Sequence, residues 1–127
     1  MIFLDEIRDY LIDQSVVEGS TGWGCYIGYL PPNEQSIELH FVYGEVNQET
    51  EDKIYYVEVI GRGGTLHDLI EKMYEIYNAL NDGNIGETET RSYIYSYAMS
   101  SNPDFAGYDE NHNPVMSWEF KIMAEAL

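Results

Sequence analysis

Histidine and cysteine are the side chains that most often ligate metals or attack substrates, and this chain contains three His and one Cys. The surrounding patterns predict His40 in a strand, His67 at the start of a helix and His112 in a loop. No two of them have the spacing of a metal-binding pair, and none adjoins a serine or the cysteine in a nucleophile motif. Cys25 lies in an apolar stretch with no base near it in sequence, so we expect a small core residue. Surface histidines, no metal and no catalytic thiol are therefore predicted.

A glycine-rich motif, Gly61-Arg62-Gly63-Gly64, follows a predicted strand and precedes a predicted helix, where phosphate-binding loops lie. The dinucleotide-binding pattern requires a further glycine at the position that Leu66 occupies. The nucleoside triphosphate pattern requires a Gly-Lys-Ser/Thr run, which does not follow. We therefore predict a plain turn and expect no cofactor.

A second polar motif has the alternate spacing of the first ligands in a calcium-binding loop: Asp109, Asn111 and Asn113. Pro114 occupies the position of the glycine that forms the loop, and Phe120 that of the bidentate acid. Because Asp and Asn also favour turns, the motif is interpreted as a connection before the last strand. No metal site is predicted.

Acidic residues are the most abundant candidates for acid–base chemistry, since 23 Asp and Glu oppose six Lys and Arg and give a net charge of −17. They fall mainly on predicted polar faces and loops, so no catalytic pair stands out and there is no positive case for an enzyme. This charge repels phosphate backbones and anionic headgroups, which argues against direct binding to nucleic acids or membranes. It fits a solvated surface, a mimic of DNA, or the lining of a passage for DNA.

Tyrosine is the unusual residue type, because 12 Tyr, 4 Phe and 2 Trp make 14% of the chain aromatic. Strand alternation places Tyr93, Tyr95 and Tyr97 on one predicted face. Tyrosine combines a large ring with a polar hydroxyl and is favoured at protein interfaces. The same face could equally lie beneath a helix, so self-association and the core remain alternatives.

The elements that position these residues follow from hydrophobic periodicity. Apolar residues at three- and four-residue steps predict helices over residues 2–14 and 66–80, with Thr65 as the second helix's N-cap. Strands are predicted over 23–30, 36–43, 53–60, 93–98 and 115–124, with 53–60 central and residues 100–113 a loop. In the second strand, Ile37, Leu39, Phe41 and Tyr43 are expected to face the core.

This order predicts an α+β fold, a mostly antiparallel four- to five-stranded sheet with two helices packed on it, in the order α-β-β-β-α-β-β. The length of 127 residues suits a single domain over 1–127. One cysteine allows no intrachain disulfide and fits a reducing compartment. Asp5 and Glu6 follow the apolar N-terminus at once, unlike a signal peptide, and we expect neither export nor a membrane span.

Nearly the whole chain resembles the minor capsid or tail-terminator proteins of long-tailed bacteriophages. The segments that carry the resemblance are Gly28-Tyr29-Leu30-Pro31-Pro32, Tyr55-Tyr56-Val57-Glu58-Val59-Ile60-Gly61-Arg62-Gly63, Ile76-Tyr77-Asn78-Ala79-Leu80, Asn102-Pro103-Asp104-Phe105-Ala106-Gly107-Tyr108-Asp109-Glu110-Asn111 and Trp118-Glu119-Phe120-Lys121-Ile122. The family pattern has a proline a few residues before Gly-Arg-Asp-Glu-Asn-Gly. This chain keeps Pro103 and most of the motif, with Tyr108 in place of the arginine and His112 in place of the last glycine.

The resemblance implies a non-enzymatic virion part, a ring that is usually sixfold, which caps the tail tube and docks it to the head connector. Its partners would be further copies of itself, the tail tube protein and the head-completion or connector protein. It would be located at the head–tail junction of the virion, and in the host cytoplasm during assembly.

A closed ring requires two different patches that meet between neighbours. The candidate interface residues are Tyr93, Tyr95, Tyr97, Phe105 and Tyr108. An exposed acidic loop predicted over residues 44–52, with Glu45, Glu49, Glu51 and Asp52, is expected to face the channel and repel passing DNA.

The alternative is an acidic inhibitor that imitates DNA and occupies the basic groove of a nuclease or polymerase. Such a protein would bind its partner in a strongly salt-dependent way. A small hydrolase with paired acids would need two carboxylates converging in an apolar cleft, which the sequence does not indicate.

Overall fold

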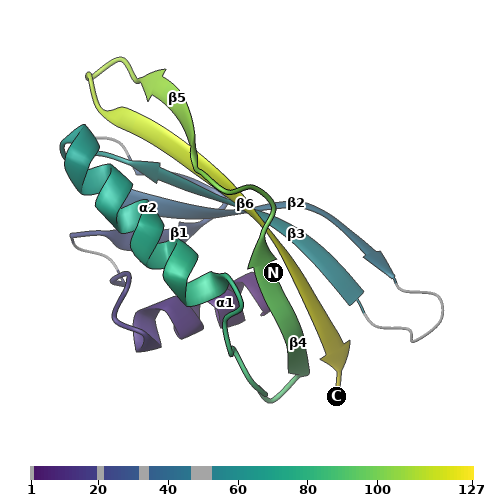
Figure 1. The fold of residues 1–127 in the computed structure, drawn as a ribbon. Helices are drawn as coiled ribbons and strands as arrows, with labels where there is room; N and C mark the ends of the chain where they lie inside the picture. Colours follow the sequence, from purple (N-terminus) through teal and green to yellow (C-terminus); the bar gives the residue numbers. More distant parts are fainter. Residues whose placement is uncertain (1, 20–21, 32–34, 47–52) are drawn as a thin grey trace.

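Two helices lie on one face of a six-stranded sheet in the computed structural model, which describes residues 2–19, 22–31, 35–46 and 53–127 (Figure 1). The elements in chain order are α1 (Ile2–Asp13), β1 (Gly24–Ile27), β2 (Ser36–Val46), β3 (Lys53–Arg62), α2 (Leu66–Leu80), β4 (Arg91–Ala98), β5 (Asp104–Tyr108) and β6 (Pro114–Ala126). The α+β class and both helices are as predicted. The sheet has more strands than the four to five expected.

The strand order is β1-β2-β3-β6-β4, and β5 pairs with β6 beside the end of β4. β1 runs parallel to β2, so the sheet is mixed, and the other pairings are antiparallel. β3 lies between β2 and β6, which confirms its predicted central position. β6 is the longest strand, with β4 against its C-terminal half and β5 against its first residues.

The core fills the space between the helices and the sheet. Its largest fully buried side chains are Phe3, Ile7 and Leu11 of α1, Leu69, Met73, Ile76 and Leu80 of α2, and Ile37, Leu39, Trp118, Phe120 and Ile122 of the sheet. Trp118 stacks on Tyr77 of α2 with ring centroids 4.6 Å apart, and its indole N–H donates to the Ser100 carbonyl at 3.0 Å. The buried face of α2, set by its 3.6-residue period, thus packs on the buried face of β6, set by strand alternation.

The second helix begins where the sequence predicts, because the Thr65 hydroxyl accepts a hydrogen bond from the backbone N–H of Asp68 at 3.1 Å. Gly61 lies beneath this helix, inside β3 and not in a turn after it. A Cβ at Gly61 would come within 2.8 Å of Leu69 Cδ1, so the missing side chain allows α2 to approach the sheet closely.

Several predictions about the strands are wrong. β1 is shorter than residues 23–30, and β2 continues through Val46, so Glu45 lies in a strand instead of an acidic loop. Tyr43 was expected in the core but is 49% exposed, because a bulge between Phe41 and Tyr43 turns the strand over. β5 lies within the predicted loop 100–113.

Candidate interaction surface

One face of the sheet carries no helix among the described residues, and we call it the open face. Strand alternation and the observed register assign its side chains. They are Glu38, His40, Tyr43 and Glu45 of β2, Ile54, Tyr56, Glu58 and Ile60 of β3, Ser117, Glu119, Lys121 and Met123 of β6, and Tyr95 and Tyr97 of β4.

A row of three tyrosines and one lysine crosses the open face. Tyr43 pairs with Tyr56, Tyr56 with Lys121, and Lys121 with Tyr97, so the row spans four adjacent strands. The rings of Tyr43 and Tyr56 stack at 4.3 Å. The Lys121 ammonium lies 5.8 Å from the Tyr56 centroid and 6.0 Å from that of Tyr97. We call these residues the tyrosine row.

Glu45 sets the electrostatics of the row, since the Tyr56 hydroxyl donates to its carboxylate at 2.9 Å. This hydrogen bond, with partial desolvation, raises the pKa of Tyr56 and keeps the phenol neutral. Desolvation lowers the pKa of Lys121, but Tyr95, Tyr97 and Glu45 together raise it above its usual value. The row therefore combines neutral aromatic rings with one positive charge.

The predicted face of three tyrosines is wrong, because Tyr93 lies on the helix side of the sheet. Tyr93 pairs with Ala124 and Tyr95 with Met123, so Ile94 is an extra residue in β4. Only Tyr95 and Tyr97 reach the open face, where their rings stack at 5.2 Å.

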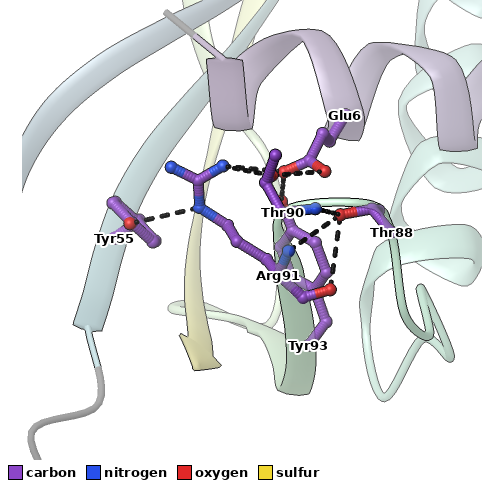
Figure 2. A network of polar contacts seen from close by, with 6 residues as sticks. All are labelled: Glu6, Tyr55, Thr88, Thr90, Arg91 and Tyr93. Carbon is purple, nitrogen blue, oxygen red and sulfur yellow. Dashed lines mark hydrogen bonds and ion pairs between the residues drawn. The ribbon is translucent and has the colours of Figure 1, made fainter. Parts of the chain in front are cut away.

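Tyr93 belongs to a polar network that joins α1 to β4 (Figure 2). The Glu6 carboxylate accepts hydrogen bonds from Arg91 at 2.9 Å, from Tyr93 at 3.0 Å and from Thr90 at 3.1 Å. Arg91 also donates to the Tyr55 hydroxyl at 3.4 Å. Burial raises the pKa of Glu6, but the hydrogen bonds outweigh it and hold the pKa below its usual value. The network is a structural tie between helix and sheet.

An acidic groove of about 460 Å³ lies beside this network, between α1 and the connection before β4. It is lined by six carboxylates, those of Asp5, Glu6, Asp9, Asp13, Glu87 and Glu89, together with Tyr10, Ile85, Thr88 and Thr90. Asp5, Asp9 and Asp13 follow one helix face at four-residue spacing, a signal present in the sequence. The sequence contains no signal that residues 85–90, which are far along the chain, lie against this helix face.

Phe105 and Tyr108 lie apart from the other predicted interface residues. They are on β5, where their rings meet edge to face at 5.5 Å, and they pair with Met116 and Pro114 at the start of β6. Both are strongly exposed. The structure therefore divides the predicted set of five into Tyr93 beneath α1, Tyr95 and Tyr97 on the open face, and Phe105 and Tyr108 on β5.

The predicted acidic loop is represented by Glu45 alone, since Glu49, Glu51 and Asp52 lie outside the described residues. Glu45 is in β2, and its carboxylate accepts a hydrogen bond from Tyr56 of the tyrosine row. Its orientation toward a channel remains a prediction.

Two of the three histidines lie beside a carboxylate, and the cysteine is buried. His40 lies 3.4 Å from Glu38, and His67 lies 3.0 Å from Glu71. Burial raises the pKa of the Cys25 thiol to about 12. Within residues 2–19, 22–31, 35–46 and 53–127, no three His, Cys, Asp or Glu side chains converge in a way that could hold a metal ion.

Asp109 has the turn role that the sequence predicts. Its carboxylate accepts hydrogen bonds from the backbone N–H groups of Asn111 and Asn113, each at 2.9 Å. These bonds, together with Arg62 at 3.6 Å, hold its pKa below the usual range despite partial desolvation. The motif thus closes the turn between β5 and β6.

No protein-family model matches this chain, and no curated protein matches it. In the part of the chain that the structure describes, neither helix is long and apolar enough to cross a membrane. The distribution of exposed apolar side chains and of charge is therefore the basis for a functional proposal.

Proposed function

We propose that this chain is a non-enzymatic structural protein of a long-tailed phage that forms a ring at the end of the tail tube. The ring ends the tail and joins it to the head connector, so the chain acts at the head–tail junction of the virion. The proposal rests on the family resemblance and on one observation: the large apolar side chains that are exposed include residues of β2 and of β5, which lie toward opposite edges of one sheet.

The first group of exposed side chains, on the outer half of β2, consists of Val42, Tyr43 and Val46, exposed by 42%, 49% and 54%. Tyr43 lies on the open face, and Val46 lies on the other face of the strand. The second, the β5 patch, consists of Phe105 and Tyr108, exposed by 49% and 59%. Phe105 and Tyr108, whose rings meet, form an exposed apolar patch of the kind that is typical of protein interfaces. Two unlike exposed strands on one chain favour head-to-tail contacts between copies, which close into rings when the rotation permits.

The net charge of −17 supports a role beside DNA without binding to it. A ring of several such subunits would repel phosphate groups, so the genome would pass without adhering. An acidic surface, with Glu45 and its neighbours in sequence as the first candidates, would line this channel.

The experiment is to measure the mass of the purified protein in solution at 0.1 M and 1 M salt, and to image the particles by electron microscopy. Particles with a central hole are expected, together with binding to tail tubes assembled without this protein. Failure to bind tail tubes under both salt conditions would contradict the proposed function.

The acidic groove beside α1 favours a second candidate, an inhibitor that imitates DNA. Six carboxylates along one groove could occupy a basic cleft on a nucleic-acid enzyme. Salt distinguishes the candidates, because binding to a basic partner weakens as salt rises, whereas association of like-charged copies strengthens. Capture of a basic enzyme by a monomer at low salt, lost at 1 M salt, would support the inhibitor.

A further inference from the structure

The open face is the side of the sheet on which no described helix packs, because α1 and α2 both lie on the other side (Figure 1). Within the tyrosine row, Tyr43 and Tyr97 are exposed by 49% and 39%. Tyrosine is enriched where proteins meet, since its ring supplies contact area and its hydroxyl tolerates water. The open face therefore offers aromatic contact area that the fold itself does not use.

A row of ionisable side chains lies directly beside the tyrosine row. His40 of β2 pairs with Glu58 of β3, and Glu58 pairs with Glu119 of β6. Residues two apart in a strand share a face and are separated by about 7 Å along it. Glu58 is therefore the neighbour of Tyr56 on the open face, and Glu119 is the neighbour of Lys121.

Glu58 and Glu119 form an opposed pair of like charges. Directly opposite residues of antiparallel strands have Cβ atoms about 4.5–5.5 Å apart, and like charges there are destabilising. Neither carboxylate makes a hydrogen bond or ion pair with another described residue. His40 lies 3.4 Å from Glu38 instead, and Arg62, at the end of β3, lies 3.6 Å from a carboxylate of the turn before β6. A cation from another molecule would relieve this repulsion.

Lys121 shows that the tyrosine row accepts a cation. Its ammonium lies 5.8 Å from the ring centroid of Tyr56 and 6.0 Å from that of Tyr97. The Tyr56 hydroxyl donates to Glu45, which places another carboxylate on the same face. Cation–ring contacts and carboxylates thus occur side by side on the open face.

Charge decides which partner fits this face. Its side chains include Glu38, Glu45, Glu58 and Glu119 but one lysine, Lys121. A nucleic acid would bring phosphate groups and a second copy would bring the same carboxylates, so both would be repelled. Arginine fits best, because its planar guanidinium pairs with carboxylates through two hydrogen bonds and stacks on aromatic rings.

We propose that the open face docks a partner protein segment that presents arginine, with one guanidinium bridging Glu58 and Glu119 beside the tyrosine row. One guanidinium can reach both carboxylates, because their Cβ atoms lie opposite each other on adjacent strands. Side chains next to this arginine would contact the exposed ring of Tyr43. The proposal goes beyond the ring function and does not rest on it, because it concerns one face of a single chain.

The first test measures binding of the blocked peptide acetyl-Gly-Arg-Gly-Arg-Gly-amide to the full chain by saturation-transfer NMR at 0.1 M salt. The same peptide with citrulline, which has the shape of arginine without its charge, is expected not to bind. The peptide with lysine in place of arginine is expected to bind at least about threefold more weakly, because an ammonium cannot pair bidentately.

The double variant Glu58→Gln/Glu119→Gln is expected to raise the Kd of the arginine peptide at least about fivefold, because it removes charge-assisted hydrogen bonds. Glu71→Gln/Glu110→Gln makes the same change in net charge at exposed positions off the open face, and is expected to raise the Kd less than about twofold. The first variant removes opposed like charges, so it should not lower the free energy of unfolding, which urea unfolding verifies.

Tyr43→Leu tests the contribution of the tyrosine row. It is expected to raise the Kd about two- to fivefold, the effect of one exposed cation–ring contact. Tyr29→Leu is the control, because Tyr29 is 57% exposed and lies in the connection after β1, away from the row. Equal effects of the two substitutions would overturn the assignment of the peptide to the open face.

Three further outcomes would overturn the proposal. Equal weakening in the two glutamine double variants would mean that binding follows total charge. Stronger binding of a single-stranded DNA of about 12 nucleotides, lost in Tyr43→Leu, would assign the face to nucleobases. Absence of peptide binding, with a solution mass that falls in Tyr43→Leu, would assign the face to a second copy. Tail-tube binding by the wild-type chain tests the ring function separately in each case.

Discussion

Tyr93 and Tyr95 lie on opposite faces of the sheet, although a single residue separates them in β4. Their partners on β6, Ala124 and Met123, are consecutive, so the chain gains one residue at Ile94. The Tyr93 hydroxyl donates to Glu6 of α1, whereas the Tyr95 ring stacks on Tyr97 on the open face. Neighbouring tyrosines therefore serve the core and the surface separately.

We predict that Tyr93→Phe lowers the free energy of unfolding by about 1–2 kcal/mol, because Glu6 loses a donor in a half-buried site. Tyr95→Phe is the matched control, expected to change it by less than about 0.5 kcal/mol. Urea unfolding followed by tryptophan fluorescence measures both. Equal losses in the two variants would contradict the assignment of the two tyrosines to different faces.

The ionisation of the Glu6 carboxylate is expected to make the stability of the fold depend on pH. Its hydrogen bonds hold the folded-state pKa below the unfolded value near 4.5, so the stability it contributes is present above that pH and is lost as pH falls through the folded pKa. Glu6→Gln is expected to lower the free energy of unfolding by about 2 kcal/mol at pH 7. The difference from wild type is expected to narrow at pH 3.

The measurement is urea unfolding of both proteins at pH 7 and pH 3. Asp9→Asn is the control, an exposed carboxylate of the same helix, expected to change stability by less than about 0.5 kcal/mol at pH 7. A difference between Glu6→Gln and wild type that stays constant from pH 7 to pH 3 would contradict the argument.

The long periodic elements were predictable from the sequence because one rule governs each over many residues. The apolar period of α2 and the alternation of β6 appear in the structure with their expected faces buried. The Thr65 cap was also predictable, since its hydroxyl and the first turn are adjacent in sequence.

Bulges account for much of what the sequence did not reveal. β2 has one extra residue at Val42, and β4 has one at Ile94. After each extra residue, the side chains point to the opposite face of the sheet from the one that strict alternation predicts. As a result, Tyr43 is exposed, and Tyr93 and Tyr95 lie on different faces. No residue type marks these positions. β5 was missed because its hydrogen bonds depend on β6 and its residues include a glycine at a bulge. The acidic groove depends on a tertiary approach between α1 and residues 85–90.

The turn between β5 and β6 carries a strained residue, because His112 has a φ of 60°. We predict that His112→Gly raises the free energy of unfolding by up to about 1 kcal/mol. Left-handed backbone costs about 1–2 kcal/mol for a residue with a side chain, and glycine avoids this cost. Part of the gain is cancelled because glycine loses more conformational entropy on folding.

The comparison for this turn is Gly107→Ala, at a φ of 94° with no atom within 4 Å of an added Cβ. Because an added Cβ would meet no other atom, Gly107→Ala should lower the free energy of unfolding through backbone strain alone, by about 1–2 kcal/mol. Thermal and urea unfolding of both variants should therefore give shifts of opposite sign. Shifts of the same sign would contradict the account of the turn.

The close approach of α2 to β3 gives the last prediction. A Cβ at Gly61 would lie 2.8 Å from Leu69 Cδ1, 2.9 Å from Met73 Sδ and 3.2 Å from Ile37 Cδ1, and all three side chains are fully buried. Gly61→Ala should therefore lower the free energy of unfolding by about 1–3 kcal/mol through overpacking, although alanine is ordinarily favoured over glycine within a strand.

Gly19→Ala is the control for this effect, because among the described residues the nearest atom to an added Cβ would be Arg8 Nη2, at an ordinary contact distance of 3.7 Å. We expect it to change the free energy of unfolding by less than about 0.5 kcal/mol. Urea unfolding at pH 7 compares the two variants. If Gly61→Ala is as stable as Gly19→Ala, α2 does not lie this close to the sheet. If instead Gly61→Ala alone is destabilised, the helix is held against β3 by a contact that only glycine permits.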